Sequence, residues 1–149
     1  MSQREATSHL KFIMVPVDGS DASMDAVALA CDIARKNKGK VYVVHVIEVK
    51  RSLPLDAELE PEAAAGESVL AQAEAVARQQ DFEVDGELLQ AREAGHAIVD
   101  EAIERGVNLI ILGIAYPAPF GDFQLGRMPQ YVLRSAPCEV WLCRHQLQE

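Results

Sequence analysis

The stretch Phe12-Ile-Met-Val-Pro-Val17, followed directly by Asp18-Gly19-Ser20-Asp21, decides how this chain is interpreted. Six mostly apolar residues that stop at a polar, glycine-containing turn predict a buried strand. Ser20 or Asp21 can cap a following helix. That helix is indicated by apolar residues at helical spacing, namely Met24, Val27, Ala28, Cys31 and Ala34. This part of the chain therefore predicts a strand, a tight turn and an amphipathic helix.

The same alternation of strand and helix continues along the rest of the chain. Val41–Ile47 is apolar on both faces, which is typical of a central strand in a parallel sheet. Further strands are expected at 83–90, 108–112 and 139–143, and further helices at 67–80, 95–105 and about 129–135. Strands that alternate with helices predict an α/β fold, in which a doubly wound parallel sheet is covered on both faces.

Length and local composition predict one domain with two loose segments. At about 150 residues per domain, the 149 residues form a single domain over 1–149. Residues 1–10 are polar and mixed in charge, without the pattern of a signal peptide, and we expect a flexible N-terminus there. Residues 50–66 are rich in Pro, Ala and Glu, and we expect a mobile connection there.

The charge and cysteine content exclude several classes of partner. The formal net charge is −9, and residues 52–104 hold 14 acidic residues against two basic ones. This balance argues against nucleic acid, whose binding needs clustered cations. No apolar run approaches the ~18 residues that a membrane span requires, so we expect no membrane insertion. Three cysteines without a CxxC pattern fit a reducing compartment, and we expect a cytoplasmic protein.

Ligands of such a sheet bind beyond the carboxyl ends of the strands, where the winding reverses. If the strand order is 3-2-1-4-5, the first and fourth strands are neighbours, with Asp18 after the first and Gly113 after the fourth. Asp18 is the best polar candidate for a ligand contact, and turn formation with helix capping is the alternative. Arg92 is a second candidate, although it could instead pair with Glu93 or Asp100.

Residues 121–128 imitate a phosphate-binding P-loop, but Arg127 and Met128 replace its Lys and its Ser/Thr. Gly126 still precedes a predicted helix, whose free N–H groups and partial positive charge suit a phosphate. Arg127 can add a bidentate contact. The alternative is that Gly126 only permits a turn and that Arg127 is solvated.

Other residues that could bind a metal or take part in catalysis give weaker signals. His45 lies mid-strand among Val and Ile, and we expect a core histidine with one hydrogen bond. Cys138, Cys143 and His145 lack a fourth ligand, so no metal site is expected. The hydrolase pattern G-x-S-x-G and the dinucleotide pattern G-x-G-x-x-G do not occur.

Five stretches, in order and with matching spacing, resemble the universal stress protein family. They are Val15–Ser20, Val44–Ile47, Gly95–Ile98, Val107–Gly113 and Tyr131–Val140. The resemblance spans essentially the whole chain. It implies a five-stranded, Rossmann-like sheet of the adenine nucleotide alpha hydrolase type, in order 3-2-1-4-5. It also implies a homodimer formed by pairing of the last strands, here Glu139–Cys143.

The resemblance further implies an adenine nucleotide site. Family members that bind ATP carry G-x2-G-x9-G-[ST] after the fourth strand, and Gly113 and Gly126 match its first and third glycines. Tyr116 and Arg127 replace the second glycine and the Ser/Thr, which favours fewer phosphates or another small anion. We expect Arg92 and Tyr116 to be ligand contacts. The predicted nucleotide-binding residues are Pro16, Val17, Asp18, Val46, Leu112, Gly113, Gly126, Arg127 and Met128.

The resulting expectation is a cytoplasmic protein that binds AMP, ADP or ATP, with or without Mg²⁺, in a regulatory or stress-response role. We expect no robust catalysis, because no general base stands out. One alternative is an interaction module that has lost nucleotide and regulates a partner such as a membrane transporter through its acidic face. Residues 120–123 and 125–127 also resemble stress-protein domains associated with membrane transporters. Another alternative is a slow nucleotide hydrolase.

Overall fold

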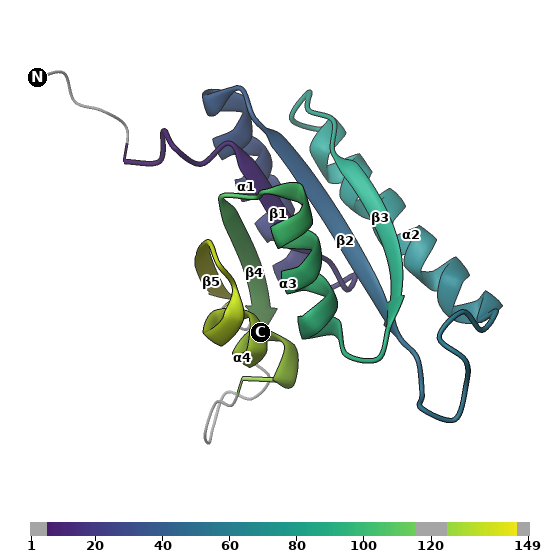
Figure 1. The fold of residues 1–149 in the computed structure, drawn as a ribbon. Helices are drawn as coiled ribbons and strands as arrows, with labels where there is room; N and C mark the ends of the chain where they lie inside the picture. Colours follow the sequence, from purple (N-terminus) through teal and green to yellow (C-terminus); the bar gives the residue numbers. More distant parts are fainter. Residues whose placement is uncertain (1–5, 116–124, 146–149) are drawn as a thin grey trace, which may run out of the picture.

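Strands and helices alternate along the chain in the computed structural model, which describes residues 6–115 and 125–145 (Figure 1). The elements are β1 (Phe12–Pro16), α1 (Asp21–Asn37), β2 (Lys40–Glu48), α2 (Glu60–Arg78), β3 (Asp85–Ala91), α3 (Ala94–Arg105), β4 (Leu109–Ala115), α4 (Arg127–Ser135) and β5 (Glu139–His145). All strand pairs are parallel, and the order is β3-β2-β1-β4-β5. The predicted fold class and strand order are confirmed.

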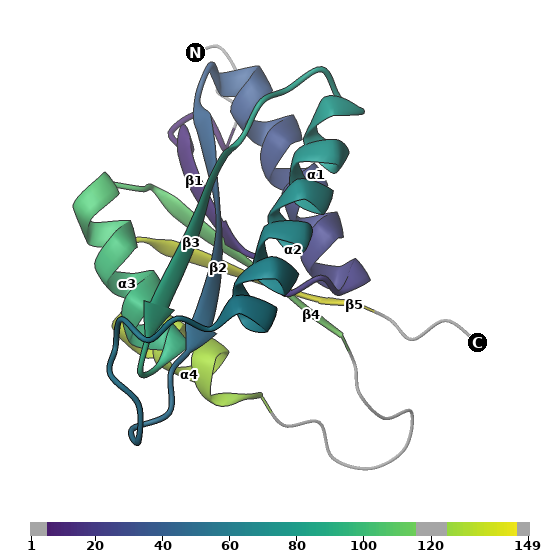
Figure 2. The ribbon, with the colours of Figure 1, turned by 90° about the vertical axis from the view of Figure 1, so that its right-hand side faces the viewer.

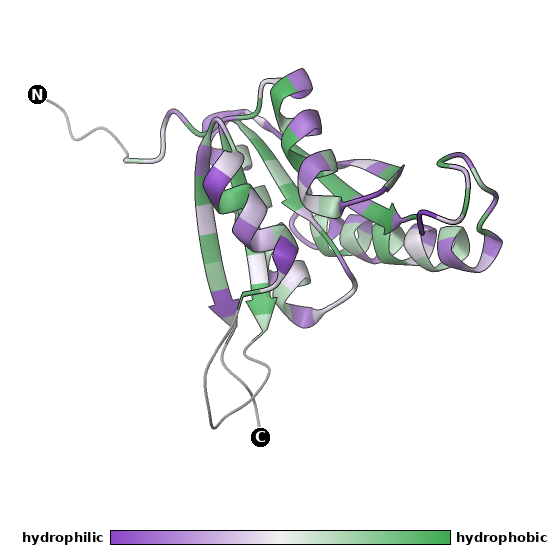
Figure 3. Ribbon diagram, turned by 60° about the horizontal axis from the view of Figure 1, so that its bottom comes forward, coloured by the Kyte–Doolittle hydropathy of each residue, from purple (hydrophilic) through white to green (hydrophobic). Residues whose placement is uncertain are grey.

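Helices cover both faces of the sheet, as Figure 2 shows nearly edge-on. On one face α1 and α2 pack against Ile13, Val15 and other sheet residues, while α3 and α4 pack around Met14 and Ile110 on the other face. Neighbouring residues of β1 thus point into two separate cores, as the period of two in a strand requires. In Figure 3, apolar residues dominate the strands, and polar residues alternate with apolar ones along the helices.

The first helix begins and ends as its sequence dictates. Ser20 is the N-cap of α1, and its side-chain oxygen accepts a hydrogen bond from the Ser23 N–H at 3.1 Å. Lys38 ends the helix in the left-handed conformation, with φ 57°. Because α1 follows β1 and β4 runs parallel to β1, the α1 cap lies at the carboxyl ends of these two neighbouring strands.

The expected mobile connection at 50–66 is wrong in its second part, because α2 begins at Glu60 instead of at 67. Pro61 lies in the first turn, where its missing N–H costs no hydrogen bond. Glu60 and Glu62 complement the positive end of the helix dipole, and the alanines that follow favour helix. Gly66, inside α2, then packs so closely that a Cβ there would lie 2.9 Å from the His45 ring.

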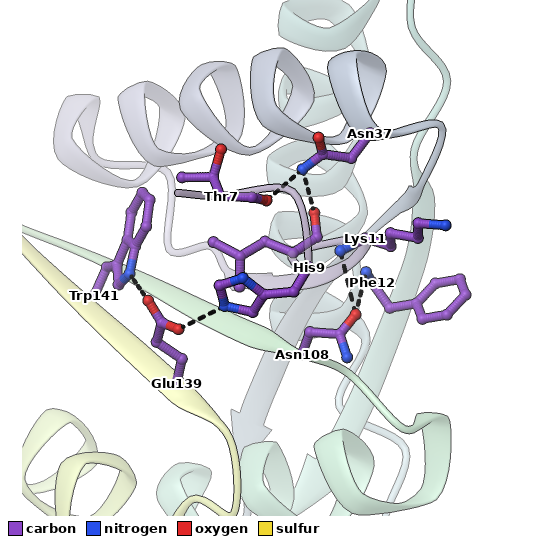
Figure 4. A network of polar contacts seen from close by, with 9 residues as sticks. Thr7, His9, Lys11, Phe12, Asn37, Asn108, Glu139 and Trp141 are labelled. Atoms are coloured by element: carbon purple, nitrogen blue, oxygen red, sulfur yellow. Dashed lines mark hydrogen bonds and ion pairs between the residues drawn. The ribbon is translucent and has the colours of Figure 1, made fainter. Parts of the chain in front are cut away.

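The described part of the predicted flexible N-terminus is anchored, which corrects that expectation for residues 6–10 (Figure 4). Leu10 is fully buried. The Asn37 side-chain amide donates to the carbonyls of Thr7 and Leu10, at 2.6 and 3.0 Å. Burial of Leu10 and the two hydrogen bonds thus hold this segment against α1, although its composition alone is typical of a flexible terminus.

The fourth strand continues past the point where it was expected to stop, and Gly113 lies inside it. A Cβ on Gly113 would lie 2.1 Å from the Ala22 carbonyl oxygen, which is far inside contact distance. Gly113 therefore permits the first turn of α1 to pack directly on β4. Within the described residues, no helix is long and apolar enough to cross a membrane.

Candidate functional site

A cavity of about 130 Å³ opens at the carboxyl ends of β1, β2 and β4, where the winding reverses; we call it the first cavity. Its lining is mostly apolar and comes from both strands and helices. Of the candidate residues, the structure places here Pro16, Val17, Asp18, Val46, Leu112, Gly113 and Met128. The predicted meeting of Asp18 with Gly113 at the switch point is therefore present.

Asp18 is held by the turn that connects β1 to α1. Its Oδ1 accepts a hydrogen bond from the Ser20 N–H at 2.9 Å, which closes an Asx turn. Partial burial raises the pKa of Asp18, but hydrogen bonds from Ser20 and Ser23 outweigh burial, so the pKa lies below its ordinary value. The side chain is thus both a turn-former and an ionised carboxylate on the cavity wall, and the two interpretations of Asp18 are compatible.

His45 is the main cavity residue that sequence reasoning assigned only to the core. Its Nδ1 lies 2.7 Å from the carbonyl oxygen of Val17. Because a carbonyl can only accept, Nδ1 carries the proton, and the other ring nitrogen of a neutral His45 is an acceptor. His45 pairs with Leu88 in the β2–β3 ladder, and this position in the strand does not indicate a contact with Val17. Ser23, Val44, Ala94 and Ile98 complete the lining that had not been anticipated.

A second cavity of about 420 Å³ lies between the start of α3 and the length of α4. It shares Ala94 and Met128 with the first cavity, so the two adjoin. Arg92 and Arg127 line this second cavity and are absent from the lining of the first. Gly126 lines neither of them, and its Cβ would meet only Pro129, at an ordinary 3.8 Å. Tyr116 falls outside the described residues.

Several polar groups of the second cavity already have partners. The Arg92 guanidinium donates to the Lys50 carbonyl at 2.6 Å, so neither Glu93 nor Asp100 is its partner. Glu48 accepts a hydrogen bond from the Ala94 N–H at 2.8 Å, which caps α3 from outside. Glu93 lies 3.5 Å from His96. Arg92 therefore acts first as a brace that ties the chain after β2 to the end of β3.

These features define a class: doubly wound α/β proteins of one sheet, with a small ligand-sized crevice at the switch point. The sequence profile of the universal stress protein family matches residues 9–144. The chain belongs to the universal stress protein family. A universal stress protein of Thermus aquaticus is 34% identical over 90% of this chain and 98% of its own length. One from Methanocaldococcus jannaschii is 26% identical over 98% and 89%, respectively.

Solved structures of universal stress proteins share the fold. One from Archaeoglobus fulgidus superposes with a TM-score of 0.75 at 24% identity, over 89% of this chain and 97% of the other. A structure of an Archaeoglobus fulgidus universal stress protein in complex with dAMP gives 0.71 at 21% identity, over 89% and 96%. An Arabidopsis thaliana family protein with AMP bound gives 0.66 at 15% identity, over 91% and 92%.

Proposed function

We propose that this protein binds an adenine nucleotide in the first cavity and serves a regulatory role in the cytoplasm, without robust catalysis. The observation that carries the proposal is the cavity at the switch point, which gathers seven of the nine nucleotide-binding residues named from the sequence. The structures of relatives with dAMP and AMP bound support the choice of an adenine nucleotide.

The first cavity has the chemistry that a nucleoside needs. Val17, Val46, Leu112 and Met128 supply apolar surface for a base. The ionised carboxylate of Asp18 can accept hydrogen bonds from ribose hydroxyls, and its Oδ1 is oriented by the Ser20 N–H. The phosphates would then point toward Arg127, across the residues shared with the second cavity.

Calorimetric titration with adenosine, AMP, ADP and ATP, with and without Mg²⁺, tests the proposal. We expect Asp18→Ala to weaken the binding of all four ligands by about 1–3 kcal/mol, because a polar contact to ribose is lost. Asp21→Ala, which changes an exposed carboxylate in the same segment, is the matched control and should leave affinity unchanged. Failure of every nucleotide to bind the wild-type protein would reject the proposal.

A homodimer through β5 is part of the same proposal. Among the strands of residues 6–115 and 125–145, β5 lies at the edge of the sheet and pairs with β4 alone, and Leu142 on it is 37% exposed. Edge strands offer unpaired N–H and C=O groups to a second copy. Sedimentation equilibrium of wild type against Val140→Pro tests this: the wild type should be dimeric, and the proline variant, which removes an edge N–H, should dissociate. A wild-type monomer would contradict it.

A second candidate function is regulation of a protein partner, such as a transporter, without nucleotide. The observation that favours it is a run of exposed acidic side chains before and within the first turns of α2, namely Asp56, Glu58, Glu60, Glu62 and Glu67. Reversal of these charges should abolish co-purification of a partner from a cell extract. Unchanged co-purification, or none with wild type, would contradict this function.

A further inference from the structure

The second cavity is larger than the first and differs from it in chemistry. Three arginines line it, Arg92, Arg127 and Arg134, against two glutamates, in a chain whose formal net charge is −9. Both glutamates are already engaged, one by the α3 cap and the other by His96. The three arginines still outnumber the two carboxylates, so the lining carries a positive formal charge that suits an anionic group.

Two of these arginines are available to a ligand. Arg127 and Arg134 make no hydrogen bond or ion pair with any other described residue, whereas Arg92 is held by backbone carbonyls. They are seven residues apart on α4, so they lie on one face of the helix, about 10 Å apart along its axis. Two guanidinium groups at this spacing can each contact a different phosphate of a chain that follows the helix.

An aromatic surface lies in the same cavity. The His96 and Tyr131 rings are stacked, with their centroids 3.9 Å apart and an interplanar angle of 27°. Gly95 makes room for this pair, because a Cβ there would lie 2.9 Å from the Tyr131 side chain. The His96 side chain is 52% exposed, so the stacked pair is open to another ring. Stacked rings beside unpaired arginines are the combination that recognises a nucleobase with its phosphates.

We propose that the second cavity binds the distal nucleotide of a dinucleoside polyphosphate. Its proximal adenosine lies in the first cavity, its phosphate chain runs past Arg127 toward Arg134, and its distal base stacks on His96. The inference rests on the proposed function, because the proximal adenosine occupies the site described above. The shared residues Ala94 and Met128 are where the phosphate chain passes from one cavity to the other.

Calorimetry with matched ligands tests the inference. The probes are AMP, adenosine 5′-tetraphosphate and diadenosine tetraphosphate, of which only the last has a second base. We expect diadenosine tetraphosphate to bind about tenfold more tightly than adenosine 5′-tetraphosphate, the gain that stacking of one base typically gives. His96→Ala should remove this gain, and Arg134→Ala should weaken both tetraphosphates and leave AMP unchanged. Arg78→Ala, an exposed arginine on α2, is the control.

The outcomes separate the two proposals. Equal affinity for the two tetraphosphates in wild type overturns the inference. So does a His96→Ala variant that still binds diadenosine tetraphosphate about tenfold more tightly than adenosine 5′-tetraphosphate. In either case, binding of AMP leaves the proposed function standing. No binding of any adenine nucleotide overturns both. Circular dichroism of each variant confirms that an altered affinity does not come from a lost fold.

Discussion

The two ends of the sheet are built on different principles. At the amino ends of the strands, polar side chains pair with one another or with backbone: Asn108 with two amide groups, Asn37 with two carbonyls and Glu139 with His9 and Trp141 (Figure 4). At the carboxyl ends, the structure leaves cavities, and Arg127 and Arg134 lack partners among the described residues. The carboxyl ends therefore combine groups that already have partners, such as Asp18 and Arg92, with two cations that remain available to a ligand.

The largest effect should come from Gly113→Ala, which tests whether the carboxyl end depends on close backbone packing. The added Cβ would meet the Ala22 carbonyl oxygen at 2.1 Å, so α1 must move. We expect a loss of about 3 kcal/mol or more in the free energy of unfolding, measured by urea denaturation. Gly126→Ala, at the N-cap of α4, is the matched control and should cost about 1 kcal/mol or less. Equal losses would contradict the comparison.

A smaller effect is expected at the amino end, from Asn108→Ala. The Oδ1 atom accepts the N–H groups of Lys11 and Phe12, at 3.2 and 2.9 Å, and alanine leaves both without this acceptor. We expect a loss of about 1–3 kcal/mol in stability and no change in nucleotide affinity. Asn108→Asp keeps an acceptor oxygen and should restore most of the stability. A changed affinity would show that the two ends are not independent.

Arg127→Ala should have the opposite result, with a lower affinity for nucleotides and an unchanged stability. We expect the affinity for AMP and ATP to fall by about 1–1.5 kcal/mol, because a charge-assisted contact to phosphate is lost. The affinity for adenosine and the urea midpoint should not change. Equal losses for adenosine and AMP in calorimetry would show that Arg127 does not act on the phosphates.

The smallest effect concerns pH. Hydrogen bonds from Trp141 and His9 lower the pKa of Glu139 below its ordinary value. A lowered folded-state pKa stabilises the fold above the unfolded pKa of about 4.3, and this contribution is lost as pH falls through the folded value. The urea midpoint of wild type should therefore fall slightly more below pH 4 than that of Glu139→Gln. Parallel acid profiles would contradict this role.

The sequence predicted the fold more completely than the site. The resemblance supplied the strand order, which periodicity could not, and the turn after β1 placed Asp18 correctly. The start of α2 was missed because its N-cap, Leu59, has no capping side chain. His45 was assigned to the core because nothing in its neighbours reveals a contact with Val17, 28 residues away.

Arg127 shows a second limit of prediction from the sequence. Arg127 was expected to contact a ligand at the Asp18 site, yet it lines the adjoining cavity. Sequence spacing locates a residue on a helix, but it does not give the direction in which that helix lies against its neighbours. His96 and Tyr131 come together across 35 residues for the same reason, and no spacing rule would have paired them.

The contact between Gly113 and Ala22 also makes one mechanical unit of two distant parts of the chain. With no side chain between them, the end of β4 cannot shift without pushing on the turn of α1 that follows Asp18. One wall of the crevice is therefore stiff. If the crevice adjusts to ligands of different size, the opposite wall must move. There α3 and α4 meet through side chains that can change rotamer.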